Sequence, residues 1–381
     1  MYLIFNSFAA RYHLEIVNCS TSDLSILAYT INSHWAAVTS EKQQTKPARE
    51  YFVMIQIYKN TTIYVMAPAS FSSGGPELLH QLCHKLVKLG YNAMIYYHPD
   101  AENPVHPNFV KYNCRYVTQL EDKQEHVLVM PETFFFMAGQ FKNIRKCGWW
   151  LSVDNLFKTK EAPKHYRFIK KMGLPGLYKW AIMMGKIKGK FTYHVAQSVY
   201  AVDFVQKWGM EAGYLSDYLN DGFLQQSKQA TATAKKAQVL YNPLKGLAFT
   251  QKIMAAVPEV KWIPIQHMTP AQVGELLNES MLYIDFGEHP GKDRFPREAA
   301  IYKCCVITGK KGSAAFQEDV PIPERYKIED TEANLPEIAG LIRSCLSDYN
   351  EHIRQFDSYR DWIYGEEAGF EKDITTIFKM A

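Results

Sequence analysis

The residues best suited to chemistry lie between positions 285 and 300, in the sequence DFGEHPGKDRFPREAA. An apolar run precedes this segment, and its glycine- and proline-containing loop region holds three cations, Lys292, Arg294 and Arg297. Backbone amides left free at the start of a helix, with cations beside them, form a binding site for a diphosphate. The segment therefore predicts a phosphate site between a strand and a helix. The alternative is a charged surface loop with ordinary capping of the helix.

The same segment carries an acid that can recognise a sugar. Glu298 follows Pro296 in the first turn of the expected helix. A carboxylate there can accept hydrogen bonds from two neighbouring hydroxyl groups, such as those of a ribose. A ribose contact beside a diphosphate contact predicts a nucleotide as the ligand.

Strands and helices must position these residues, and the first set of them begins at residue 61. TTIYVMAP at 61–68 is a short apolar run typical of a buried parallel strand. A glycine loop follows, then a helical pattern at 77–90 that ends at Gly90, and a second apolar run at 91–99. This order is a βαβ unit. Three later apolar runs continue the series: HVLVMPE, CGWWLSVDN and KFTYHVAQS.

A second set of alternating strands and helices begins after residues 224–237, which are mostly small and polar and form the best linker candidate. The apolar runs VLYNPLKG, KWIPIQHM, MLYIDFG and CCVITG are the expected strands. One helix is expected to begin at a Thr269 cap with Pro270 in its first turn. We therefore predict an α/β fold with two Rossmann-like domains facing a central cleft, where open sheets of this type bind ligands.

The predicted domain boundaries follow from these patterns. They are a small β-rich N-terminal extension at 1–60, an N-terminal Rossmann-like domain at 61–223, the linker at 224–237, a C-terminal Rossmann-like domain at 238–346, and a helical tail at 347–381.

The strand, the glycine-containing loop and the glutamate that opens an alanine-rich helix resemble the donor-binding signature of retaining GT-B glycosyltransferases. In that family two glutamates eight positions apart contact the donor sugar and the ribose. Glu298 matches the second, whereas the first falls at Pro290, and Glu288 and His289 are its nearest substitutes. This departure leaves the retaining or inverting outcome open.

Two further motifs carry the same resemblance, which covers residues 61–381. Lys245 and Gly246 follow the first strand of the second domain, like the family's Lys-Gly turn, whose lysine meets the donor diphosphate. Leu240 stands where the family usually has an arginine. Gly74 and Gly75 follow the first strand of the N-terminal domain, where the family's glycine-rich loop faces the donor phosphates; an ordinary turn between a strand and a helix is the alternative.

The acceptor is expected in the N-terminal domain, where two acids follow apolar strands. Glu132 and Asp154 are candidates for a general base that deprotonates an acceptor hydroxyl, and a capping or turn role is the alternative for each. Glu288 is a third catalytic candidate. The aspartates form no convincing metal-binding pair, so we expect metal-independent hexosyl transfer with no cofactor beyond a nucleoside-diphosphate sugar as co-substrate.

Residues 158–190 are strongly basic, with ten Lys or Arg against the single acid Glu161, a local charge of +9. Apolar residues that include Tyr178 and Trp180 are interleaved with these charges, as in segments that bind an anionic membrane surface. The alternative is a solvated pair of helices whose apolar face joins the core. No nucleic-acid recognition motif accompanies the charge, so we expect no nucleic-acid partner.

The bulk composition restricts the cellular setting. The seven cysteines are scattered without a CxxC pair, which argues against a disulfide framework or a zinc site. No signal peptide or long apolar run is evident, so we expect a cytoplasmic protein, peripheral on the inner membrane face. The expected function is sugar transfer to a glycan or lipid-linked acceptor, in bacterial surface polysaccharide synthesis. A sugar-nucleotide epimerase, a phosphorylase or another two-Rossmann enzyme, and a non-catalytic binding subunit of the same fold, are the alternatives.

Overall fold

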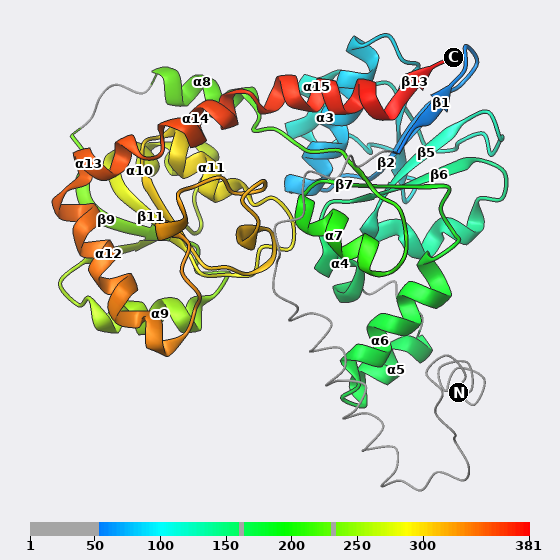
Figure 1. Ribbon diagram of the computed structural model, residues 1–381. Coiled ribbons are helices and arrows are strands. Elements are labelled where there is room, and N and C mark those ends of the chain that lie inside the picture. Colours follow the sequence, from blue (N-terminus) through cyan, green and yellow to red (C-terminus); the bar gives the residue numbers. More distant parts are fainter. Residues whose placement is uncertain (1–52, 160–163, 230–233) are drawn as a thin grey trace, which may run out of the picture. The chain divides into compact units, whose positions relative to one another are not determined.

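The computed structural model describes residues 53–159, 164–229 and 234–381 (Figure 1). The described residues fall into two compact units. The main unit comprises 53–159 and the described residues of 189–381, and the basic helical segment comprises 164–188. The predicted N-terminal extension lies outside the described residues up to position 52.

The first half of the main unit is built on a parallel sheet of seven strands in the order β4-β3-β2-β5-β6-β7-β8. Its central strands are the apolar runs found in the sequence, and they are buried along nearly their whole length because helices cover a parallel sheet on both faces. The strands are β2 Ile63–Pro68, β3 Ala93–His98, β4 Tyr116–Val117, β5 Val127–Pro131, β6 Arg145–Trp150, β7 Tyr193–Ala196 and β8 Gly213–Tyr214.

Helix α3 (Gly74–Lys88) follows β2 and packs on β2 and β3. Leu78, Leu82 and Leu86 recur every fourth residue and are buried, which is the spacing of one helix face. Gly90 has the positive φ of +87° that ends the helix region as predicted. The other helical elements of this half are η1 Pro107–Tyr112, η2 Glu132–Gln140, α4 Val153–Lys158 and α7 Val199–Lys207. Helix α8 (Asp221–Gln229) follows and packs in the second half.

The second half contains a parallel sheet of four strands in the order β10-β9-β11-β12. Its strands are β9 Lys236–Tyr241, β10 Lys261–Pro264, β11 Ser280–Asp285 and β12 Cys305–Thr308. Its helices are α9 Leu247–Ala256, α10 Pro270–Glu279 and α11 Arg294–Ile301, with short helical turns η4 Gly312–Ala315, η5 Glu324–Tyr326 and η6 Glu332–Asn334. The predicted start of α10 is confirmed, because Thr269 caps the helix and forms a capping box with Gln272, with Pro270 as the first helical residue.

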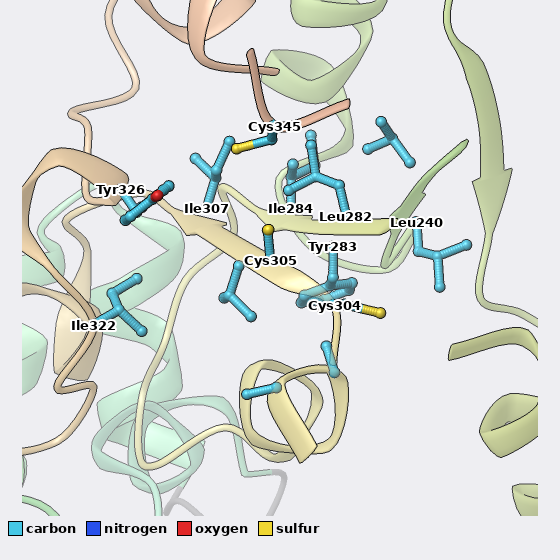
Figure 2. Packing of buried hydrophobic residues seen from close by; sticks show 14 of the residues in the cluster. Leu240, Leu282, Tyr283, Ile284, Cys304, Cys305, Ile307, Ile322, Tyr326 and Cys345 are labelled. Carbon is cyan, nitrogen blue, oxygen red and sulfur yellow. The ribbon is translucent and has the colours of Figure 1, made fainter. Parts of the chain in front are cut away.

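The core of the second half is made by side chains from adjacent strands (Figure 2). Leu240, Leu282 and Ile307 come from three neighbouring strands and are fully buried. Cys305 of β12 and Cys345 of the following helical region lie in the same cluster. The six cysteines among the described residues are free thiols.

The C-terminal residues do not form a simple helical tail. Helices α12 (Leu335–Ser347), α13 (Tyr349–Arg354) and α14 (Asp357–Tyr364) belong to the second half. Helix α15 (Glu366–Ile377) buries Phe370 and Ile374 in the core of the seven-stranded sheet, and β13 (Phe378–Met380) pairs in parallel with β1 (Ile55–Ile57). The chain therefore crosses between the halves a second time, which local sequence patterns did not indicate.

The predicted linker is only partly a linker. Helix α8 extends to Gln229 and β9 begins at Lys236, so both ends of the 224–237 stretch belong to regular elements. Its residues 230–233 lie outside the described part of the chain. The polar composition of α8 explains the misassignment, because Phe223 is the one residue of this helix that is fully buried.

The basic helical segment contains α5 (Lys164–Lys171), α6 (Pro175–Ile182) and the π-helical turn η3 (Met183–Ile187). Helix α5 packs on α6, and α6 continues into η3. Phe168 and Met172 are exposed, whereas Tyr178 is buried. No helix in the described ranges is both long and apolar enough to cross a membrane.

Candidate functional site

The loop between β11 and α11 is held at its first end by Asp285. At the end of β11, the Asp285 carboxylate accepts hydrogen bonds from the Tyr283 hydroxyl at 2.8 Å and from the Gly287 amide at 3.0 Å. Helix α11 begins at Arg294, two residues before the predicted Pro296, so Glu298 lies in its second turn. The predicted order of strand, loop and helix is therefore confirmed with a shifted helix start.

The β9–α9 turn lies directly against this loop. A Cβ atom on Gly246 would overlap the carbonyl oxygen of Phe286, and a Cβ atom on Gly287 would overlap the Cβ atom of Lys245. Gly246 also has a φ of +61°, which glycine adopts without strain. The two glycines let the backbones of both segments approach, which brings Lys245 to the loop. Its contact with a donor diphosphate stays a prediction.

Charges of alternating sign connect Lys245 to the end of β11. The Lys245 ammonium lies 2.7 Å from both carboxylate oxygens of Asp293. Asp293 Oδ2 lies 3.0 Å from His289 Nδ1, and His289 Nε2 lies 3.4 Å from Asp285 Oδ1. Burial opposes charge on the imidazole, but the two carboxylates raise the pKa of His289 to about 10, so the ring is protonated at neutral pH.

Asp285, His289 and Asp293 also have the grouping that a metal ion requires, with ligand atoms within 4.8 Å of one another. The two ring nitrogens of His289 face different carboxylates, and a metal ligand must be deprotonated. Lys245 and the charged imidazole already supply the positive charge that balances these acids. The arrangement therefore fits an ionic chain better than a metal centre, and metal independence remains a prediction.

Arg294 connects the loop to the N-terminal half. Its Nη1 lies 2.8 Å from Glu77 Oε2, and its Nε lies 3.2 Å from Glu298 Oε1. A Cβ atom on Gly74 would lie 3.7 Å from Arg294 Cδ, in ordinary contact. Gly74 thus lies beside a cation of the candidate site, and Gly75 follows it in the first turn of α3.

The four cations of the candidate site differ in how much of their side chains is exposed to solvent. The side chains of Lys245 and Arg294 each retain 31% of their accessible surface, whereas those of Lys292 and Arg297 retain 1%. Glu298 is buried, and burial raises the pKa of its carboxyl group although Arg294 and Arg297 oppose this shift. Lys245 and Arg294 are therefore the members of this group that can reach a ligand from solvent.

Lys292 and Arg297 contact acids of the protein. Lys292 Nζ lies 2.9 Å from Glu366 Oε1 and 3.2 Å from Asp217 Oδ1. Arg297 donates through Nη2 to Asp217 at 2.7 Å and through Nη1 to Glu366 at 2.9 Å. Direct contact of these two cations with a diphosphate remains a prediction. It would require Asp217 and Glu366 to lose their ion pairs with Lys292 and Arg297 while remaining buried.

Glu77 is a residue of the site that sequence reasoning missed. It lies in the first turn of α3 and, besides Arg294, accepts hydrogen bonds from the Tyr112 hydroxyl at 3.0 Å and the Asn220 amide at 3.1 Å. Burial opposes ionisation of the carboxyl, but Arg294 and Lys111 hold the pKa of Glu77 below its usual range. An acid two positions after a glycine pair was the available signal.

Glu132, predicted as a catalytic candidate, lies at the carboxyl end of β5 but is enclosed. Its Oε2 accepts a hydrogen bond from the Leu151 amide at 3.0 Å, and its Oε1 accepts one from Asn155 Nδ2 at 3.2 Å. Burial raises the pKa of Glu132 to about 7 against these hydrogen bonds. The carboxyl group therefore holds the turn before α4 in place.

Asp154 is partly exposed and Glu288 is exposed. Asp154, in the first turn of α4, is 3.3 Å from Lys158, and Glu288 is 3.5 Å from Lys311. After burial, these two acids are the largest influences that raise the pKa of Tyr200 to about 12. The pKa of Tyr200 is therefore raised by acids from both halves of the main unit.

The two halves of the main unit contact each other beside these acids. The Val153 amide donates a hydrogen bond to the Pro290 carbonyl at 2.9 Å. A Cβ atom on Gly291 would overlap the carbonyl oxygen of Leu151, so only glycine fits there without movement. The Asp319 carboxylate accepts hydrogen bonds from the amides of Val199 and Tyr200 at the start of α7. The candidate donor loop therefore lies against the candidate acceptor residues.

Comparison with known proteins supports this geometry at the level of the fold. No family model matches the sequence, and the search of curated proteins gave no match. A glycosyltransferase from Rickettsia africae is 13% identical, with a TM-score of 0.52 over 83% of this chain and 99% of its own. Sucrose-phosphate synthase from Thermosynechococcus elongatus is 12% identical, with a TM-score of 0.54 over 84% and 97%. HepE of Anabaena, solved with UDP-glucose, is 11% identical, with a TM-score of 0.55 over 83% and 98%.

The chain has the GT-B glycosyltransferase fold. The predicted fold class is thereby confirmed, including its two parallel α/β halves. The candidate site lies in loops after the carboxyl ends of the strands, which is where open α/β sheets bind ligands.

Proposed function

We propose that this GT-B protein is a glycosyltransferase that transfers a sugar from a nucleoside-diphosphate sugar to a glycan or lipid-linked acceptor. The observation that carries the proposal is the convergence of the Lys245 turn, Arg294 and the Gly74 loop at the β11–α11 loop. HepE, which shares the fold, was solved with UDP and with UDP-glucose. A role in bacterial surface polysaccharide synthesis is part of this proposal.

In the proposed reaction, Lys245 and Arg294 neutralise the diphosphate leaving group, on which negative charge grows in the transition state. Each of them is held by a carboxylate, Asp293 or Glu77, which keeps the cation in place before the donor binds. Glu298 lies one helical turn after Arg294, and its carboxylate accepts hydrogen bonds from the ribose hydroxyl groups. These cations take the place of a metal ion, so neither a metal nor a cofactor is required.

Asp154 is the proposed general base among the three acids predicted for catalysis. Its side chain retains 28% of its accessible surface, so an acceptor hydroxyl can approach it. Glu132 is enclosed by Leu151 and Asn155 and supports the turn that carries Asp154. Glu288, which lies one residue before His289 in the donor loop, is proposed to contact the transferred sugar.

Nucleotide binding provides the first test. Lys245→Ala and Arg294→Ala should each weaken binding of UDP by about tenfold to a hundredfold, because each removes a charge-assisted contact to phosphate. Glu298→Ala should also weaken it through the ribose. Isothermal titration calorimetry with UDP, in buffer containing EDTA, measures these effects.

Lys261→Ala is the matched control, since this exposed lysine begins β10 at the opposite, amino edge of the same sheet. Its UDP affinity should equal that of the wild type. Unchanged affinity in all three site variants would show that the donor site lies elsewhere. Binding that disappears in EDTA and returns with Mg²⁺ would refute metal independence.

Three experiments distinguish the alternative functions from sugar transfer. An epimerase releases no nucleotide, so release of UDP from UDP-sugar that depends on an added acceptor excludes it. A phosphorylase of this fold carries pyridoxal phosphate, which an absorbance spectrum detects. Nucleotide-sugar binding without transfer to any acceptor would favour a non-catalytic binding subunit.

The basic helical segment is proposed to bind an anionic membrane surface and so present a lipid-linked acceptor. Phe168 of α5 and Met172 after it are four positions apart and exposed, with Lys170 and Lys171 beside them. Exposed apolar side chains flanked by cations are typical of elements that lie at the lipid headgroup boundary. Trp180, the residue predicted to insert, is only partly exposed.

Vesicle binding tests this part of the proposal. Changing Lys186 and Lys188 of the segment, together with Lys190 two positions after it, to Gln should weaken binding to anionic vesicles by about a hundredfold, since each basic residue near the surface contributes about 1 kcal/mol. The control changes Lys59, Lys207 and Lys261 to Gln, an equal loss of charge in the main unit. Sedimentation with neutral and anionic vesicles should show binding that falls as salt rises. If both variants bind anionic vesicles equally well, or if the protein binds neither lipid, the segment is a solvated surface and not a membrane-binding element.

A further inference from the structure

Two chain crossings connect the two halves of the main unit. The first leads from β8 through residues 215–220 to α8, and the second leads from α14 through Gly365 to α15. Each crossing has one buried acid at its centre, Asp217 in the first and Glu366 in the second. The two acids lie far apart in the sequence but meet the same pair of cations.

The four charged groups form a closed and buried ionic cluster. Asp217 and Glu366 each pair with both Lys292 and Arg297, at distances between 2.7 and 3.2 Å. Ser216 Oγ accepts a further hydrogen bond from Lys292 at 2.8 Å, and Gln197 Nε2 donates one to Asp217 at 2.9 Å. Two cations balance two carboxylates, so the cluster is neutral.

The cations of this cluster belong to the candidate donor loop and its helix. Lys292 stands between Gly291, which touches Leu151, and Asp293, which holds Lys245. Arg297 lies one turn after Arg294 in α11, and its Nη2 also donates to the Lys292 carbonyl at 3.3 Å. A displacement of either crossing would therefore move the residues that flank the candidate diphosphate cations.

A buried ion pair tolerates the loss of one partner poorly, because the remaining charge is left without solvation. Lys292 or Arg297 could bind a diphosphate only by leaving Asp217 or Glu366 uncompensated. We propose that Lys292 and Arg297 are positioning residues, which clamp both chain crossings to the donor loop and set the loop's geometry for the nucleotide. This proposal rests on the donor site proposed above and replaces direct phosphate contact by these two cations.

The clamp and direct phosphate contact predict opposite effects when a carboxylate is neutralised. If Lys292 and Arg297 bind phosphate, Asp217→Asn and Glu366→Gln remove competing anions and should strengthen UDP binding. If they form a clamp, the same changes loosen the crossings and should weaken UDP binding, by about fivefold or more. The sign of the change in affinity therefore separates the two roles.

Calorimetry with UDP on the full chain makes this measurement, with Arg297→Lys as a milder variant. That change keeps the charge but loses the planar fork that contacts both acids, so the clamp predicts weaker UDP binding. Lys327→Met is the control, because it removes a buried lysine of the same half that contacts Phe316 and neither crossing. Its UDP affinity should match that of the wild type.

Hydrogen exchange of the nucleotide-free protein provides a readout that does not depend on the donor. The clamp predicts faster amide exchange in residues 214–220 and 362–368 of Asp217→Asn and Arg297→Lys, and unchanged exchange there in Lys327→Met. Tighter UDP binding by Asp217→Asn, or unchanged exchange at both crossings, would overturn the clamp. Failure of the wild type to bind UDP would refute a uridine donor but leave the exchange result to decide on the clamp.

Discussion

Replacing Gly312 by alanine is expected to destabilise the protein by about 3–5 kcal/mol. Gly312 has a φ of +57°, which costs an L-residue with a Cβ atom strain energy. The added Cβ atom would also overlap the carbonyl oxygen of His289 and lie 2.7 Å from its carbonyl carbon. Because the obstacle is backbone, no side-chain rotation relieves the overlap.

The effect should extend to the donor loop. Next to Gly312, the Ser313 amide donates to the His289 carbonyl at 2.8 Å and the Ser313 hydroxyl donates to the Gly291 carbonyl at 2.7 Å. A shifted Gly312 would displace both bonds, so UDP binding should weaken together with stability. Urea denaturation followed by circular dichroism measures the loss of stability, and calorimetry measures the affinity.

Gly340→Ala is the control for this substitution. Gly340 lies within α12, and a Cβ atom there would have nothing within 4 Å. Alanine should be neutral or stabilise the helix by up to about 1 kcal/mol. If the free energy of unfolding of Gly312→Ala lies within about 1 kcal/mol of that of the wild type, the 309–313 loop can move enough to accept the added Cβ atom.

The second large expected effect is a dependence of the free energy of unfolding on pH, caused by Glu132. Burial raises the pKa of this carboxyl group from 4.5 to about 7, so the folded protein binds the proton more tightly than the unfolded chain. The stabilisation is fully present below pH 4.5 and is lost progressively as the pH rises to 7. The shift corresponds to a decrease of about 3 kcal/mol in the free energy of unfolding across that range.

Glu132→Gln should remove this decrease. The glutamine oxygen can still accept the hydrogen bond from the Leu151 amide, so the fold should be retained. Burial also raises the pKa of Asp319 and Asp373 to about 6, and their contributions to the pH dependence remain in the variant. The variant should therefore show a flatter stability curve between pH 4.5 and 7 and greater stability than the wild type at pH 8.

Urea denaturation at a series of pH values makes this measurement, with the exposed Glu102→Gln as control. The control curve should follow that of the wild type. A Glu132→Gln curve as steep as that of the wild type would mean that Glu132 is ionised without penalty in the folded protein.

Local sequence patterns were sufficient to locate most of the regular elements. The apolar runs at 61–68, 91–99 and 126–132 are strands β2, β3 and β5, because a strand covered on both faces must be apolar throughout. Thr269 and Pro270 marked the start of α10 for a reason that is also local, the satisfaction of free amides in the first turn. These features depend on neighbouring residues only.

Elements without a local pattern were missed. Strands β4 and β8 contain two residues each, too few for a periodicity. The return of α15 and β13 to the first sheet depends on Phe370 and Ile374 fitting a core made by residues far earlier in the chain. A helical pattern shows which face is apolar but not which core the face will join.

The sequence by itself determined that cations and a glutamate gather after β11, because parallel strands bring the loops at their carboxyl ends to one edge of the sheet. Only the tertiary structure decided which of these cations face solvent. Arg297 is buried against Asp217 and Glu366, which are 80 and 69 positions away in the chain. The state of a charge depends on its desolvation and its partners, and both are set by contacts between distant segments. Four cations that look equivalent in the sequence are therefore two partly exposed candidates for a ligand, Lys245 and Arg294, and two members of a buried cluster.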